Sequence, residues 1–129
     1  MPTYDDHFFA PAPVARVVVR HPERQQSIED VPMLIDSGAD ATLLPRSAAT
    51  FLGLEGTGER YQLVGFDGAT SESEAVLANL AFLRTNFRGR YLLIDAEVGV
   101  IGRDILNHLR LLLDGPGLHW EQHSSARRD

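Results

Sequence analysis

The chain has 129 residues, enough for one domain with a sizeable core, and its formal net charge is -6. That charge argues against general binding to nucleic acid phosphates. The sequence contains no cysteine, and all its basic residues are arginine, which excludes disulfides, a cysteine nucleophile and Schiff-base chemistry on lysine. No apolar run is long enough to cross a bilayer and no secretory leader is visible, so we expect a cytoplasmic protein without a membrane partner.

Short strand-like segments dominate the chain after a proline-rich arm at residues 1–13, which we expect to be weakly structured. Strands are predicted at 14–20, 31–35, 41–44, 61–65, 74–83, 87–94, 98–102 and 118–120. A short helix fits 45–53, which ends in a glycine, and an amphipathic helix fits 103–113. We therefore expect a mainly β domain over residues 14–120, followed by a polar tail at 121–129.

The segment Asp36-Ser37-Gly38 follows directly on the apolar strand 31–35. A carboxylate at the end of such a strand is partly desolvated, and a glycine lets a ligand or a partner chain approach the backbone closely. The serine hydroxyl is able to fix the loop by a local hydrogen bond. The tripeptide alone is also compatible with an ordinary turn. Its setting between two apolar segments favours a functional carboxylate.

A second informative segment, Val100-Ile-Gly-Arg-Asp-Ile-Leu106, opens the helix predicted near the C-terminus. With the Asp36 segment it resembles the retropepsins, the single-domain aspartic proteases of retroviral type. The resemblance extends in order of elements over about residues 14–120, and it is specific at 33–44 and 100–106. It implies a mainly β acid-protease fold, a small closed barrel-like domain with one C-terminal helix, active as a two-fold homodimer.

The resemblance also assigns roles to individual residues. Asp36 matches the catalytic aspartate, Ser37 the hydroxyl that ties the two active-site loops together, and Gly38 a backbone position that meets the substrate. Asp40 and Arg103 match an ion pair that braces the active site and the dimer. A mobile flap is expected over 62–71, with its tip at 66–68. The expected substrate contacts are Ala39, Asp40, Val64, Gly65, Phe66, Asp67 and Gly68.

Aspartic proteases need two carboxylates that share one proton, and this chain has a single Asp-Ser/Thr-Gly. The second carboxylate must then come from a second copy, which predicts a homodimeric endopeptidase acting on peptides or proteins without cofactor or metal. The alternative is a protease-like domain with weak or no catalysis that serves dimerisation or partner binding. His119 and His123 have the spacing of two metal ligands on a helix, but no third ligand is evident, and a structural role is favoured.

Overall fold

The computed structural model describes residues 2–64 and 68–123 of the chain. The strands of this part are β1 (Tyr4–Asp5), β2 (Ala12–Arg20), β3 (Ser27–Ile35), β4 (Leu43–Pro45), β5 (Gly56–Val64), β6 (Thr70–Phe82), β7 (Thr85–Ile94), β8 (Gly99–Ile101), β9 (Leu111–Asp114) and β10 (His119–Gln122). The helices are α1 (Arg46–Leu52) and α2 (Arg103–Leu106). Among the residues described, no helix has the length and apolar character needed to span a membrane.

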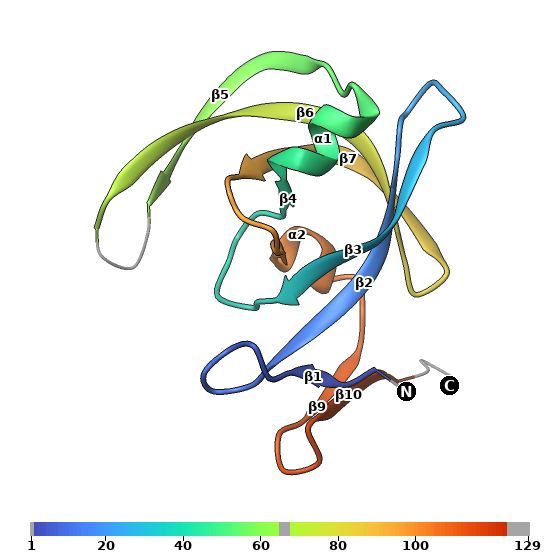
Figure 1. The fold of residues 1–129 in the computed structure, drawn as a ribbon, viewed down its shortest axis with the longest axis vertical. Coiled ribbons are helices and arrows are strands. Elements are labelled where there is room, and N and C mark those ends of the chain that lie inside the picture. The colour runs from blue at the N-terminus through green and yellow to red at the C-terminus, as the bar shows by residue number, and fades with distance from the viewer. Residues whose placement is uncertain (1, 65–67, 124–129) are drawn as a thin grey trace.

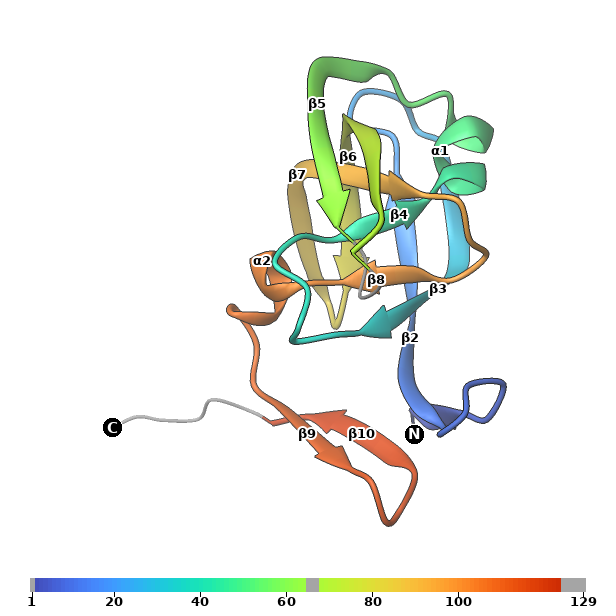
Figure 2. The same cartoon turned by 90° about the vertical axis from the view of Figure 1, so that its left-hand side faces the viewer.

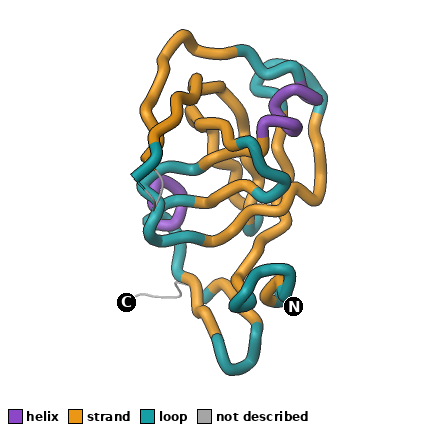
Figure 3. The backbone as a smooth tube through the Cα atoms, turned by 60° about the vertical axis from the view of Figure 1, so that its left-hand side comes forward, coloured by secondary structure: helices purple, strands orange, loops and turns teal. Residues whose placement is uncertain are grey.

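The strands curl into a closed barrel, as Figures 1 and 3 show. Neighbouring strands follow the order β2-β3-β8-β4-β7-β6, and β6 pairs back onto β2, with Val19 opposite Leu80. Closure leaves these strands without a free edge. β5 lies outside the ring and forms a long hairpin with β6 that projects from the barrel (Figure 1). The mainly β fold and the barrel-like closure predicted from the sequence are confirmed.

The barrel interior is built from alternate residues of its strands, as the two-residue period of a β-strand requires. In β2, for example, Ala15, Val17 and Val19 are buried, while Arg16 and Arg20 point outward. The fully buried large side chains come from several strands and both helices: Met33, Leu44, Leu52, Leu80, Ile101 and Ile105. One continuous apolar core therefore holds the barrel and α1 together.

The arrangement of three strands positions the loop after β3. β8 lies between β3 and β4, parallel to β3 and antiparallel to β4. Ile101, the last residue of β8, is opposite Ile35, the last residue of β3. A chain leaving β3 must therefore pass around the end of β8 before it enters β4. Residues 36–42 make this passage (Figure 2).

The sequence predicted helices at 45–53 and 103–113, and the structure has helices within both ranges. The short helix before Gly53 is confirmed, and Gly53 ends it in the left-handed conformation with a φ of 64°. The helix predicted over 103–113 is wrong beyond Leu106, because Leu111–Asp114 is strand β9. Three consecutive leucines satisfy the period of either element, and antiparallel pairing with β10 decides for the strand.

The N-terminal arm is more ordered than the sequence predicted. Tyr4–Asp5 forms β1 against Ala12–Pro13 of β2, and Thr3 bridges to His119 of β10. The partners of the arm are thus the start of β2 and, at the other end of the chain, β10. Strand β3 likewise begins at Ser27, earlier than the predicted start at Val31, because β2 supplies a partner there.

Candidate active site

The chain leaving β3 turns at Asp36, and neighbouring backbone fixes the turn. The Asp36 N–H donates a 3.0 Å hydrogen bond to the carbonyl of Ile101 at the end of β8. The Asp36 carboxylate accepts a 2.9 Å hydrogen bond from the Gly38 N–H, which orients it. A Cβ added to Gly38 would lie only 3.1 Å from that carboxylate oxygen. The side chain is partly exposed, so a molecule outside the barrel is able to reach it.

The loop and the end of β8 approach most closely at Gly102. Its N–H donates to the hydroxyl of Thr42 over 3.1 Å. A Cβ here would lie 2.6 Å from the backbone carbon and oxygen of Ala41 and 2.9 Å from the carbonyl oxygen of Ala39, so only glycine fits. The next residue, Arg103, donates its backbone N–H to the Ala39 carbonyl over 2.8 Å. Gly102 and Arg103, in the segment 100–106, thus hold the loop that follows Asp36 in place.

The Arg103 side chain does not make the ion pair with Asp40 that the resemblance implied. Its guanidinium donates a 2.7 Å hydrogen bond to the backbone carbonyl of Ser37. Among the ion pairs of the described residues, none joins Arg103 to a carboxylate. Asp40 itself is exposed. Arg103 therefore contacts the loop that carries Asp36 through the Ser37 backbone, and its supporting role at an active site stays a prediction.

Thr42 and Asp104 form a second brace, which was not predicted from the sequence. Thr42 is completely buried, and its hydroxyl donates to Asp104 over 2.7 Å while its backbone N–H donates to the other carboxylate oxygen over 3.1 Å. The same hydroxyl accepts from Gly102, so it links both segments. Burial raises the pKa of nearby Tyr91, and the negative charge of Asp104 adds to that rise. In the sequence this pair is only one threonine and an acidic residue 62 positions later, which form no recognisable motif.

The expected flap corresponds to the hairpin of β5 and β6, which Figure 1 shows extending from the barrel. Val64 pairs with Thr70 at its outer end, and 69% of the Val64 side chain is exposed. Gly68 has a φ of 81°, which suits the turn between the strands. The expected contacts Gly65, Phe66 and Asp67 lie outside the described residues. The substrate-binding roles of the hairpin and of Ala39 and Asp40 stay predictions.

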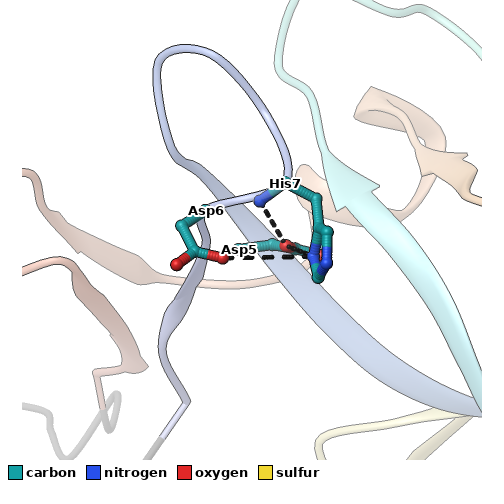
Figure 4. Close-up of polar contacts among 3 residues, drawn as sticks. All are labelled: Asp5, Asp6 and His7. Atoms are coloured by element: carbon teal, nitrogen blue, oxygen red, sulfur yellow. Dashed lines mark hydrogen bonds and ion pairs between the residues drawn. The ribbon is translucent and has the colours of Figure 1, made fainter.

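Two groups with metal-ligand chemistry lie away from this loop. His119 begins strand β10, which runs to Gln122, so the helical spacing that suggested a metal pair with His123 is not present. Asp5, Asp6 and His7 cluster in the turn after β1 (Figure 4). There the Asp5 carboxylate accepts hydrogen bonds from the His7 N–H (2.9 Å) and ring (2.7 Å), which account for the arrangement.

Barrel and loop together have the architecture of the single-domain acid proteases of retroviral type, and the chain carries one Asp-Ser-Gly. Residues 26–105 match the aspartyl protease family, and the chain belongs to that family. Its fold is similar to that of EIAV protease in complex with the inhibitor HBY-793, with a TM-score of 0.57 and 24% identity. The match covers 75% of this chain and 86% of that one. A comparison with curated proteins found no match.

Proposed function

We propose that the protein is a homodimeric aspartic endopeptidase in which each copy contributes Asp36 to one shared site. The observation that carries this proposal is the setting of Asp36, held by the end of β8 and by Gly38 at an accessible end of the barrel. The Asp36 carboxylate is partly exposed and oriented by Gly38, while the Asp36 backbone is anchored to the end of β8, which supports a functional carboxylate over an ordinary turn. The single Asp-Ser-Gly in the sequence supports a site that two copies complete.

The chemistry follows from two carboxylates brought about 3 Å apart, which cannot both ionise easily; this is the general pattern of aspartic proteases. The protonated Asp36 of one copy polarises the scissile carbonyl, and the ionised one takes a proton from the attacking water. The Arg103 guanidinium, on the Ser37 carbonyl, keeps the loop in place during this exchange. The hairpin of β5 and β6 would cover the bound peptide and exclude water.

Replacing Asp36 by Asn tests the catalytic role. Cleavage of a peptide library is measured from acidic to neutral pH, with and without a pepstatin-type inhibitor. We expect the wild type to cleave and Asp36→Asn to lose at least about a thousandfold in rate, because the amide cannot accept the proton from water. Asp30→Asn, the same change at an exposed position of β3, is the control and should cleave at the wild-type rate.

Two results would contradict the proposal. Cleavage by Asp36→Asn at the wild-type rate would remove Asp36 from the mechanism. Robust cleavage by a strictly monomeric protein would remove the shared site, and it is detected by following rate per chain against protein concentration. A dimeric wild type that cleaves nothing would favour the alternative, in which the domain serves dimerisation or partner binding.

A further inference from the structure

The outer face of the barrel carries a row of polar side chains at the place where the barrel closes. β6 pairs with β2 on one side and with β7 on the other (Figure 1). Arg20 of β2 lies opposite Asn79 of β6, and Asn79 in turn lies opposite Arg88 of β7. Val19 and Leu80 are buried in the core, so the alternation of strand side chains puts the row on the outer face. Arg20, Asn79 and Arg88 thus form one line across three strands, here called the arginine row.

Both arginines of the row are without a side-chain partner in the part of the chain that the structure describes. Arg20 and Arg88 are exposed, and neither guanidinium makes an ion pair or a hydrogen bond with a described residue. Arg90, two residues beyond Arg88 on the same face of β7, differs because it pairs with Glu59 over 3.2 Å. Two unbalanced positive charges therefore flank one neutral amide on the barrel surface.

The Asn79 side chain, between these two charges, has an unsatisfied group. Its Oδ1 atom is buried and accepts no hydrogen bond from the described residues. Buried acceptors in folded proteins nearly always have a donor, so an orphaned one needs an explanation. The donors next to it in the row are the guanidinium groups of Arg20 and Arg88. A bound anion would draw these groups together over Asn79 and so bring a donor to Oδ1.

The spacing and charge of the row indicate which anion it fits. Neighbouring strands lie about 4.8 Å apart, so the backbones of Arg20 and Arg88 are separated by roughly 10 Å, and two long side chains can converge on one group between them. A guanidinium donates in a fork that matches the oxygens of phosphate. A phosphate monoester carries a charge of about -1.5 to -2 near neutral pH, which balances two arginines, whereas a carboxylate balances one. Ser27 of β3, exposed and opposite Arg20, adds a hydroxyl at one end of the row.

We propose that the arginine row is a binding site for a phosphate group, held between Arg20 and Arg88 over Asn79. The row lies on β2, β6 and β7, whereas Asp36 follows the end of β3, so the site does not depend on the proposed peptidase activity. Free phosphate and a phosphate ester on a peptide present the same oxygens to the two guanidinium groups. The binding experiment therefore uses one probe of each kind.

The first test measures binding by titration calorimetry at neutral pH and low ionic strength. The full chain carries Asp36→Asn so that it does not cleave the peptide probe. The probes are inorganic phosphate and a short uncharged peptide with one phosphoserine, and the unphosphorylated peptide is the blank. We expect one saturable site per chain for phosphate and none for the blank. Arg20→Gln and Arg88→Gln should each weaken binding about tenfold or more, because each removes a charged donor. Arg110→Gln, the same change at an exposed arginine off the row, should not.

The second test fills the row from within. Asn79→Asp puts a carboxylate between the two guanidinium groups and should abolish phosphate binding while both arginines remain. An unchanged circular dichroism spectrum shows that the variant folds. Tighter binding of the phosphopeptide than of inorganic phosphate would identify a phosphorylated peptide as the ligand, and equal binding would identify the free anion.

Three results would overturn the proposal. The first is no saturable binding of either phosphate probe by the parent chain. The second is binding that survives both Arg20→Gln and Arg88→Gln. The third is equal weakening by Arg110→Gln, which would show a general attraction between arginines and phosphate in place of a site. None of these results bears on Asp36, so the proposed function is tested separately.

Discussion

Thr42→Val removes one hydroxyl from the point where the two specific segments of the sequence meet. Valine has nearly the same shape, so the change leaves no large cavity in the buried site. It deletes the hydrogen bond from the Thr42 hydroxyl to the Asp104 carboxylate and leaves the N–H of Gly102 without its acceptor. The expected loss of stability therefore arises from polar groups and not from packing.

The magnitude follows from those two losses. A hydrogen bond to a charged group contributes about 1.5–3 kcal/mol, and a buried donor left unpaired costs about 1–3 kcal/mol. Because both share one hydroxyl, the losses are not additive, and we expect about 3 kcal/mol in the free energy of unfolding. For a chain of this size that corresponds to a fall in Tm on the order of 10 °C. Thr42→Ser keeps both hydrogen bonds and loses only a methyl, at about 1 kcal/mol.

Thermal and urea unfolding measure the effect, with both variants in an Asp36→Asn background at neutral pH. All samples need the same protein concentration, because the proposed dimerisation would contribute to apparent stability. The result that refutes the reasoning is a Thr42→Val protein as stable as Thr42→Ser. The hydroxyl would then support neither Gly102 nor Asp104 to a measurable extent.

Two further predictions concern other positions. Gly102→Ala forces a Cβ against the Ala41 backbone and should cost about 2 kcal/mol or prevent folding, whereas Gly115→Ala, with nothing within 4 Å of its Cβ, should be neutral in the same unfolding assay. The hydrogen bond to Asp5 raises the pKa of His7 above 6.5, and the backbone hydrogen bond from His7 lowers that of Asp5 below 3.8. The Asp5–His7 pair therefore contributes fully to stability between pH 3.8 and pH 6.5. This contribution is lost as the pH rises through the raised pKa of His7, or as it falls through the lowered pKa of Asp5. NMR titration should show the His7 pKa return toward 6.5 in Asp5→Asn, and an unchanged His7 pKa would contradict the assigned contact.

The sequence was sufficient for the features that depend on local chemistry. An apolar strand that ends in Asp36-Ser-Gly and a glycine before Arg103 each have an immediate physical reason, and their order along the chain points to one fold. Gly53 likewise marked the end of α1 because a left-handed residue is needed there. Each of these features depends on a few adjacent residues, so it can be predicted without knowing which distant residues pack against them.

The features that the sequence did not reveal depend on distant partners. Thr42 and Asp104 are 62 positions apart, and nothing local marks either as a member of a buried pair. The leucines at 111–113 fit a helix until β10 is known to lie beside them. Arg103 was assigned to Asp40, but the Ser37 carbonyl is its acceptor, and a backbone acceptor carries no residue identity for a sequence to show.

Gly38, the end of β8 and Arg103 hold the Asp36 loop through hydrogen bonds inside the chain, and for the proposed homodimer this separates two kinds of defect. In the proposed dimer, each copy would bring its own β8, Gly102 and Arg103, so assembly would join two loops that are already held in shape. Dilution of the wild type should then lower the rate only through the fraction of dimer, and the rate per chain should recover at high protein concentration. A loosened loop, as in Thr42→Val, should lower kcat even when every chain is dimeric, because the carboxylates are misplaced in the assembled site. If a higher protein concentration restored Thr42→Val to the wild-type rate per chain, the braces would serve assembly and not the geometry of the catalytic pair.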